Sequence, residues 1–244
     1  MTAPAADIRR ETQAPVASLE GVSKDYGLGK VKVRALRGID LAVRPAEFLV
    51  LAGPSGSGKT TLLNLLGLID KPDSGRVVFN GKDTIPLGLN DLAPARRDSI
   101  GYIFQSFNLI PVLSVFENVE YPLILQRVPG VERRRRVEAA LEKVGLAGRR
   151  KHRPSELSGG ERQRTSIARA IVKKPAFILA DEPTANLDSE TGAAVLELMR
   201  RLNAEEGATF VFSSHDPRII GMGRRVVHLR DGAVERIEEP GGRA

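Results

Sequence analysis

Eight consecutive residues, Gly53 to Thr60, have the composition and spacing of a loop that wraps around phosphate groups. They read Gly-Pro-Ser-Gly-Ser-Gly-Lys-Thr and follow an apolar run. Glycines let backbone N–H groups approach phosphate oxygens, and a helix that begins near Lys59 adds its positive N-terminal end. In this phosphate-binding loop, Lys59 is expected to reach the β- and γ-phosphates of a nucleotide, and the Thr60 hydroxyl to ligate Mg²⁺.

Two further polar groups follow apolar runs. Asp181 and Glu182 come directly after Phe177–Ala180, and Ser213-Ser214-His215-Asp216 comes directly after Phe210–Phe212. Asp181 could hold Mg²⁺ through water, and Glu182 could polarise an attacking water molecule as a general base. Alone, such an acidic pair is an ordinary exposed turn. The phosphate-binding loop upstream favours the catalytic interpretation.

A third element, the signature segment Leu157–Arg164, also has a helix start suited to an anion. Ser158 with Glu161 three residues later is a capping box, which by itself indicates only a well-formed helix start. However, Gly159 and Gly160 occupy the first helical turn, where glycine lowers helix propensity. Both glycines are expected if the backbone must approach an anion at the positive end of the helix. The chain therefore contains two helix N-termini suited to phosphate.

The elements that must position these groups follow an α/β pattern. Continuous apolar runs such as Leu49–Ala52, Phe177–Ala180 and Phe210–Phe212 indicate strands buried on both faces, as in parallel sheets. Ligands of open α/β sheets bind outside the carboxyl ends of the strands. The sequence therefore predicts that the loop, the carboxylates and His215 converge on one site.

Other patterns complete this outline. Further strands are predicted at Ala17–Leu19, Val31–Ala35, Ile39–Val43 and Gly75–Gly81, the last with an Asn80-Gly81 turn, and a terminal hairpin at Val226–Leu229 and Val234–Ile237. Helices are predicted at Thr61–Ile69, Val131–Val144 and Gly192–Asn203, and residues from about 105 to 174 are predicted to be largely helical. The sequence contains no internal repeat and no sustained heptads.

Composition excludes several classes of protein. The chain has 244 residues with no cysteine, which excludes disulfides, thiolate-bound metals and iron–sulfur clusters. Charged residues near the N-terminus predict that it is not a secretory signal, and the longest apolar stretches are too short to cross a bilayer. The net charge is +7, and residues 127–164 hold 12 basic and 5 acidic side chains. This excess could form a salt-bridged helix face, or it could contact an anionic membrane leaflet or an acidic partner helix.

Together these motifs resemble the ATP-binding subunit of an ABC transporter, over about residues 18–237. Gly53–Thr60 resembles the Walker A loop, Phe177–Glu182 the Walker B strand with its catalytic Glu, and the signature segment the motif specific to this family. The resemblance implies the P-loop NTPase fold of ABC ATPases: a mixed core sheet flanked by helices, an antiparallel β subdomain, and a helical subdomain inserted at about 106–174. One domain would span residues 18–238, between a flexible arm at 1–17 and a flexible tail at 239–244.

The resemblance also implies the site residues. Gln105 resembles the Q-loop glutamine that contacts Mg²⁺ and the attacking water, Ala185–Asp188 the D-loop, and His215 the switch histidine that contacts the γ-phosphate. Tyr26 stands where the family places an aromatic ring against adenine, although it could be an ordinary turn residue. The implied catalytic residues are Glu182, His215 and Gln105, and the implied Mg²⁺ ligands are Thr60, Gln105 and Asp181. The implied nucleotide contacts are Tyr26, Gly53, Pro54, Ser55, Gly56, Ser57, Gly58, Lys59, Thr60, Thr61, Ser158, Gly159, Gly160 and Asp188.

In this family two copies pair head to tail, so that ATP lies between one chain's Walker A loop and the other chain's signature segment. The resemblance therefore implies a homodimer in which Ser158 and Gly160 serve the partner's nucleotide. It also implies a membrane permease partner, contacted through the helical insert, and a place at the cytoplasmic face of the inner (plasma) membrane. No nucleic acid is expected as a partner, because the repair and condensin type needs a long coiled coil and the translation-factor type carries two cassettes in one chain.

The stretches Phe107–Pro111, Glu117–Val119 and Leu179–Asp188 resemble the lipoprotein-releasing and macrolide-exporter group, which transmits motion across a membrane. Two positions depart from the commonest form: Ser213-Ser214, where Val-Thr is usual, and Glu161-Arg162, where Gln-Gln is frequent. Neither departure removes a catalytic group. A regulatory ATPase of the cell-division type and an importer subunit remain open alternatives.

Overall fold

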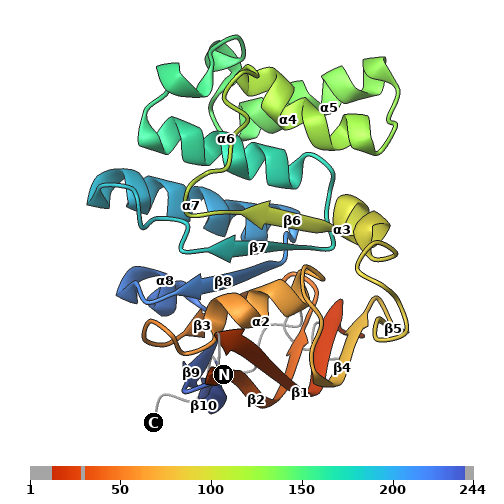
Figure 1. Cartoon of the computed structure of the whole chain (residues 1–244). Coiled ribbons are helices and arrows are strands. Elements are labelled where there is room, and N and C mark those ends of the chain that lie inside the picture. The colour runs from red at the N-terminus through yellow and green to blue at the C-terminus, as the bar shows by residue number, and fades with distance from the viewer. Residues whose placement is uncertain (1–12, 29–30, 240–244) are drawn as a thin grey trace.

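The computed structural model describes residues 13–28 and 31–239, which form two sheets and a set of helices stacked in layers (Figure 1). The strands are β1 Ala17–Leu28, β2 Val31–Val43, β3 Phe48–Ala52, β4 Ser74–Phe79, β5 Lys82–Asp83, β6 Ile100–Ile103, β7 Phe177–Asp181, β8 Phe210–Ser214, β9 Arg225–Arg230 and β10 Ala233–Glu238. The helices are α2 Lys59–Leu66, α3 Ala93–Ser99, α4 Val115–Leu125, α5 Gly130–Lys143, α6 Gly159–Ile171, α7 Ser189–Glu206 and α8 Pro217–Met222, with 3₁₀ turns η1 Ala147–Arg149 and η2 Pro154–Glu156.

The larger sheet has six strands in the order β10-β9-β3-β8-β7-β6. The strands from β9 to β6 run parallel, and β10 pairs antiparallel with β9 as the predicted terminal hairpin. Every residue of β3 and β8 is buried, because layers cover both faces of the sheet. The sequence did not indicate β6 as a strand, since Gly101 interrupts its apolar run. A Cβ at Gly101 would lie 2.9 Å from the Ile178 side chain, so the close approach of β7 explains the glycine.

The smaller sheet is antiparallel, with the order β2-β1-β4-β5. β1 and β2 have 12 and 13 residues, and both extend well beyond the short runs that the sequence predicted. Gly21 and Gly38 have positive φ at register shifts between the two strands. Such bulges reset the alternation of apolar and polar residues, so that one long strand has the sequence pattern of several short ones. The predicted Asn80-Gly81 turn is confirmed, with φ of 47° and 75°.

The arm and tail predicted from the sequence lie mostly outside the described residues, at 1–12 and 240–244. One correction is needed at the boundary. Ala17, which the sequence placed at the end of the arm, is 2% exposed and begins β1, where it pairs with Val43 and Phe79. β1 therefore begins at Ala17, the first residue of the predicted strand, and the predicted arm ends one residue too late.

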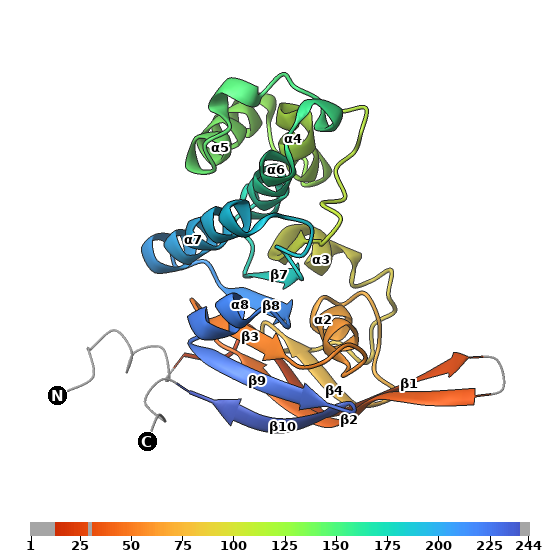
Figure 2. The ribbon, with the colours of Figure 1, turned by 90° about the vertical axis from the view of Figure 1, so that its left-hand side faces the viewer.

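Helix α2 lies between the two sheets (Figure 2). Its leucines at positions 62, 63, 65 and 66 are buried in one core with residues of β1, β2, β3, β7 and β8. The helix begins two residues before the predicted Thr61 and ends at Leu66, before the predicted Ile69. Gly67 is the C-cap of α2. A Cβ at this position would lie 2.9 Å from both the Leu179 side chain and the Tyr102 hydroxyl, which explains the glycine. The end of α2 is thereby packed closely on β6 and β7.

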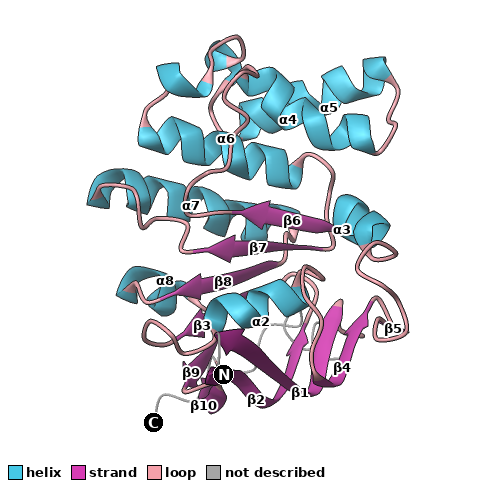
Figure 3. Cartoon of the chain, in the orientation of Figure 1, coloured by secondary structure: helices cyan, strands magenta, loops and turns pink. Residues whose placement is uncertain are grey.

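Helices α4, α5 and α6 lie between β6 and β7 in the chain and form the layer farthest from the antiparallel sheet (Figure 3). They share a core with α7, α8 and the second face of the large sheet. Helix α7 is longer than the predicted Gly192–Asn203, because Asp188 caps its N-terminus and Gly207, with φ of 67°, ends it. None of the helices in the described part of the chain combines the length and hydropathy that a membrane span requires.

Candidate functional site

The strand order brings the three predicted polar groups to one edge of the large sheet. β8 lies between β3 and β7, and all three run parallel, with Ala52 opposite Ser214 and Asp181 opposite Ser213. The phosphate-binding loop leaves the carboxyl end of β3, and Glu182 and His215 follow the carboxyl ends of the other two strands. The predicted convergence of these groups is confirmed.

Within the phosphate-binding loop, Lys59 lies back against the loop itself. Its Nζ donates hydrogen bonds to the carbonyl oxygens of Gly53, at 2.7 Å, and Pro54, at 2.8 Å. Burial lowers the pKa of Lys59, while the nearby negative charges of Glu182 and Asp181 act in the opposite direction. The ammonium group therefore lies within electrostatic reach of both carboxylates.

Close packing inside the chain also requires glycine in this loop, in addition to the expected approach of the backbone to phosphate. Gly58 has φ of 102°, and a Cβ there would lie 2.6 Å from the Ala35 carbonyl oxygen of β2. A Cβ at Gly53 would lie 2.3 Å from the Leu229 carbonyl oxygen of β9. The loop is thus packed between a strand of each sheet. Because Gly58 is the N-cap of α2, no side chain caps that helix end, and the first N–H groups of the helix have no intrahelical partner.

Glu182 is the centre of a hydrogen-bonded group. His215 Nδ1 lies 2.8 Å from Glu182 Oε1, and the Ser214 hydroxyl donates to Glu182 Oε2 at 3.1 Å. The Glu182 backbone has φ of 44°, a strained conformation that its N–H stabilises by donating to the Ser213 carbonyl oxygen at 2.9 Å. The carboxylate is 19% exposed and the His215 side chain 72% exposed, so the pair has a buried end and an accessible end.

Two contacts of the site, those of Ser214 with Glu182 and of Asn186 with Gln105, were not predicted from the sequence. Ser214 was noted as one of the polar residues that follow the apolar run Phe210–Phe212 and as a departure from the usual family residue, but its hydrogen bond to Glu182 was not predicted. Asn186 was grouped with the D-loop, and its Nδ2 donates to the Gln105 carbonyl oxygen at 3.0 Å. Gln105 itself is exposed after the end of β6.

The signature segment begins α6 with the predicted capping box. The Ser158 hydroxyl accepts from Glu161 N at 3.2 Å, and Ser158 N donates to Glu161 Oε2 at 2.9 Å. A Cβ at Gly160 would lie 2.4 Å from Thr191 Cγ2, and one at Gly159 would lie 3.2 Å from the Leu187 side chain. Close packing on the start of α7 is therefore a reason for these glycines inside the chain, in addition to the predicted approach to an anion.

The signature segment packs on the D-loop region and the start of α7. Among the described residues, the hydrogen bonds of Ser158 to Gly160 include none to residues 53–61. Asp188 caps α7 by accepting from Thr191 N at 2.9 Å, and this bonding to Thr191 lowers the pKa of Asp188. Within one chain, the N-termini of α2 and α6, the two helix ends suited to phosphate, are therefore not joined by hydrogen bonds among the described residues.

Tyr26 is a residue of β1, opposite Val33, and not an ordinary turn aromatic. Its hydroxyl donates to Asp70 Oδ2 at 2.9 Å, and Lys24 Nζ donates to the other oxygen of Asp70, also at 2.9 Å. Burial and the Asp70 bond raise the pKa of Tyr26, whereas a contact with Thr61 lowers it. The Tyr26 hydroxyl therefore lies near Thr61 in the first turn of α2, and Tyr26 is 36% exposed.

Comparison with known proteins identifies the family. Residues 36–185 match the family described as ABC transporter. The chain belongs to this family. An ABC transporter ATP-binding protein from Thermotoga maritima, itself uncharacterised, is 49% identical over 226 residues, which are 93% of this chain and 96% of that protein. As a member of the family, the chain is an ATP-binding transporter subunit and an ATPase.

Two more relatives define the group within the family. The dimeric, post-hydrolysis structure of the cassette MJ0796, a protein of Methanocaldococcus jannaschii, bound to ADP and Pi has a TM-score of 0.84 and 43% identity, and covers 93% of this chain and 99% of that one. A macrolide export ATP-binding/permease protein from Azoarcus sp. is 43% identical over 227 residues. Those residues are 93% of this chain but 34% of that longer protein. The resemblance to the macrolide-exporter group is confirmed.

The predicted ligands of this ABC cassette suit Mg²⁺. Thr60, Asp181 and Gln105 offer a hydroxyl, a carboxylate and an amide oxygen, which are the hard oxygen donors that Mg²⁺ prefers. Across the described residues no three His, Cys, Asp or Glu side chains cluster as metal ligands. A single protein carboxylate, completed by water and phosphate oxygens, is typical of Mg²⁺ in nucleotide sites. The Ser57 hydroxyl in the same loop is buried without a hydrogen-bond partner, as expected of a loop that receives a polar ligand.

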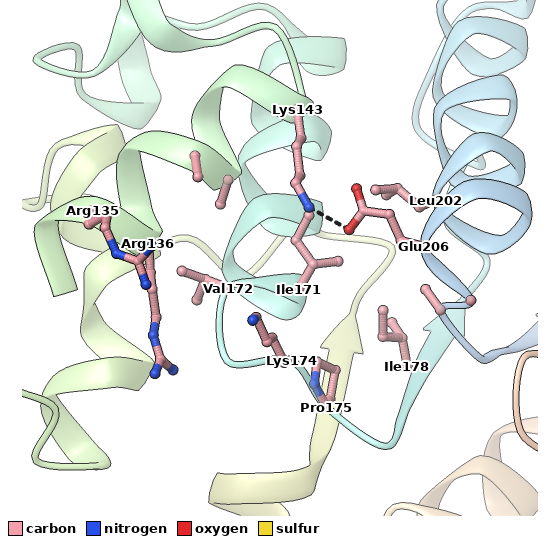
Figure 4. A pocket seen from close by; sticks show the side chains of 14 residues that line it. Arg135, Arg136, Lys143, Ile171, Val172, Lys174, Pro175, Ile178, Leu202 and Glu206 are labelled. Carbon is pink, nitrogen blue, oxygen red and sulfur yellow. Dashed lines mark hydrogen bonds and ion pairs between the residues drawn. The ribbon is translucent and has the colours of Figure 1, made fainter. Parts of the chain in front are cut away.

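A cavity of about 540 Å³ lies elsewhere, where α5 and α6 meet β7 and α7 (Figure 4). Pro175 and Ile178 line it, at the end of β7 opposite to Asp181, so it is separate from the nucleotide site. An ion pair between Lys143 and Glu206 crosses it. Arg135 and Arg136, on its rim, both bind Glu132.

The arginines of α5 support the salt-bridged interpretation of the basic segment. All four residues from Arg133 to Arg136 pair with a carboxylate, namely Glu120, Glu138 or Glu132. Exposed pairs of this kind contribute little to stability, but they reduce the charge that α5 presents to solvent. Arg149 of η1 pairs with Glu161, so Arg150 and Lys151, which follow η1, are the neighbouring basic side chains that could contact an anionic surface.

Proposed function

We propose that this ABC cassette hydrolyses MgATP at two sites shared between paired copies, and that the cycle drives a membrane permease of the lipoprotein-releasing or macrolide-exporter type. The observation that carries the proposal is the hydrogen-bonded group of Glu182, His215 and Ser214 next to the phosphate-binding loop. A general base must be held within reach of the γ-phosphate, and adjacent parallel strands provide that placement.

Nucleotide binding rests on the phosphate-binding loop. Backbone N–H groups of residues 55–61 would bind the phosphate oxygens, and Lys59 would exchange its bonds to two loop carbonyls for bonds to the β- and γ-phosphates. Tyr26 would stack on the adenine ring, because its hydroxyl is already held by Asp70 and its ring is accessible beside α2. Thr60, Asp181 and Gln105 would hold Mg²⁺, which would neutralise part of the phosphate charge when bound.

Hydrolysis rests on Glu182. Its carboxylate accepts a proton from the attacking water, whose oxygen forms a bond to the γ-phosphorus as the bond to the ADP oxygen breaks. His215 is bonded to one carboxylate oxygen and Ser214 to the other, so both orient the base. The exposed imidazole of His215 is also free to contact the γ-phosphate, which is the role that the family resemblance implies.

Pairing of two copies accounts for the second helix terminus. Ser158, Gly159 and Gly160 lie apart from the phosphate-binding loop of their own chain, and the capped start of α6 has the positive end that suits phosphate. We infer that they contact the nucleotide of the partner copy, together with Asp188. The dimeric structure of the relative MJ0796, bound to ADP and Pi, supports this arrangement.

We also infer that the cassette works at the cytoplasmic face of the plasma membrane, where ATP is available and a permease can be contacted through α4 to α6. The macrolide export relatives support this inference, because each contains both an ATP-binding part and a permease part in one protein. Export and mechanical transmission are favoured for the same reason.

Phosphate release by the purified chain in MgATP tests the proposal, with Glu182→Gln as the decisive variant. We expect Glu182→Gln to bind ATP, to lose at least about a hundredfold in kcat, and to accumulate as an ATP-bound dimer in light scattering. Hydrolysis by Glu182→Gln at the wild-type rate would exclude the general-base assignment. A chain that stays monomeric with this substitution and saturating ATP would exclude the shared sites.

A further inference from the structure

Arg169, on α6, donates hydrogen bonds to two successive carbonyl oxygens in the segment that follows β6. Its Nη2 donates to the Phe107 oxygen at 2.7 Å, and its Nη1 donates to the Asn108 oxygen. Phe107 and Asn108 have φ of 62° and 48°, in the left-handed region, which asparagine tolerates but which is unfavourable for phenylalanine. The planar guanidinium of arginine presents parallel N–H donors that fit two adjacent carbonyl oxygens, whereas the ammonium group of lysine lacks this geometry. Arg169 therefore stabilises a turn in which the backbone of Phe107 is strained.

The surroundings of Arg169 show that this turn is its main partner. No carboxylate pairs with Arg169 in the parts of the chain that the structure describes, and burial lowers the pKa of its guanidinium. Arg162 lies seven residues earlier, on the same face of α6, and its guanidinium carbon is 5.4 Å from the Phe107 ring centroid. Two arginines of one helix face thus hold one turn.

The turn lies two residues after Gln105, which the proposed function places at Mg²⁺ and the attacking water. Side chains from three helices or loops hold this segment, which crosses α6 on its way from β6 to α4 (Figure 1). Asn186, before α7, binds the Gln105 carbonyl, and the buried Asn118 of α4 binds backbone groups of residues 110–114. The third is Arg169. Of these three residues, only Arg169 belongs to α6. The N-cap of that helix, Ser158, lies about 16 Å from Arg169 along the helix axis, at 1.5 Å per residue.

We propose that Arg169 is a positioning residue for Gln105, which transmits a displacement of α6 to the segment that holds the glutamine. Contact of the Ser158 end with the nucleotide of a second copy would then influence where Gln105 lies. The inference rests on the proposed function, because it takes Gln105 as a contact of Mg²⁺ and water. α6 is a single helix with packed sides, so its two ends move together.

The first experiment compares kcat and KM for MgATP in the full chain. Arg169→Gln removes the charge and the fork, and Arg169→Lys keeps the charge but loses the fork. Arg200→Gln, on the exposed face of α7 and paired with Glu197, is the matched control. We expect kcat to fall at least tenfold in Arg169→Gln and at least threefold in Arg169→Lys. KM should stay within twofold, because the phosphate-binding loop is untouched. Wild-type kcat in Arg169→Gln overturns the proposal.

A double-mutant cycle separates positioning from a general structural effect. If Arg169 acts through Gln105, adding Arg169→Gln to Gln105→Ala should lower kcat by less than a further twofold. Multiplication of the two single effects would show independent action and overturn the proposal. Wild-type turnover in Gln105→Ala would overturn it as well, because the glutamine would then have no role to position. The ATPase function itself is decided separately, by Glu182→Gln.

Hydrogen exchange provides a measurement that does not depend on catalysis and covers the case in which Arg169→Gln fails to fold. In Arg169→Lys, the amides of Phe107 and Asn108 should exchange at least tenfold faster than in the wild type, while amides of β7 keep their protection. Equal protection of the turn in both proteins would overturn the proposal.

Discussion

The Ser214 hydroxyl donates a hydrogen bond to the Glu182 carboxylate at 3.1 Å, although 32 residues separate them in the sequence. Its neighbour Ser213 has an equally buried hydroxyl that makes no hydrogen bond within the described structure. Successive residues of a strand point to opposite faces, so only one of the two serines can reach the base. The two positions form a natural pair for testing how the base is oriented.

Ser214→Ala should lower kcat at least about tenfold, since one hydrogen bond to a charged group is worth about 1.5–3 kcal/mol. Ser213→Ala, the matched control, should leave kcat within about twofold. Steady-state phosphate release measures both variants, with ATP affinity from equilibrium binding as a check that the site is intact. Equal effects in the two variants would show that Ser214 does not orient Glu182.

Lys59→Ala should weaken ATP binding at least tenfold, because it removes the cation that the β- and γ-phosphates would bind. Lys82→Ala, an exposed lysine of β5, is the control and should bind as the wild type does. Calorimetric titration with ATP gives both affinities, and the thermal midpoint shows whether each variant is folded. Unchanged ATP affinity in Lys59→Ala would mean that Lys59 does not bind the phosphates in the wild-type complex and instead keeps its hydrogen bonds to Gly53 and Pro54.

Tyr26→Ala should lower ATP affinity roughly fivefold to a hundredfold, since stacking of a base on an aromatic ring is worth about 1–3 kcal/mol. Tyr26→Phe keeps the ring and loses only the bond to Asp70, so its affinity should stay within about threefold. A fluorescent ATP analogue or calorimetry distinguishes the two. If Phe and Ala weaken binding equally, the hydroxyl and not the ring would be the nucleotide contact.

Replacement of Arg150 and Lys151 by Glu should reduce binding to vesicles that contain anionic lipid by at least about threefold at low salt. These two residues are chosen because Arg149 already binds Glu161, next to the cap of α6. Arg200→Glu on α7 is the control for a change in net charge. Vesicle flotation measures the bound fraction, and equal binding by all three proteins would assign the basic segment to a solvated surface.

The central strands were predictable from the sequence, whereas the peripheral ones were not. β3, β7 and β8 are buried on both faces, and this environment selects continuous apolar runs. β1 and β2 are each longer than they look in the sequence, because the bulges near Gly21 and Gly38 reset their alternation. β6 was missed because its neighbour β7 requires a glycine at position 101, which resembles a break in the strand.

The sequence by itself determined the chemistry of this protein: a phosphate-binding loop, an acidic pair, a histidine and a capped glycine-rich helix start. Each of these is local, since neighbouring residues specify the backbone that it needs. Only the tertiary structure decided that Ser214 orients Glu182, that Gly160 packs on Thr191, and that Arg169 holds the turn after Gln105. Those contacts depend on strand order and on how α6 packs, and such long-range pairings leave no pattern between adjacent residues.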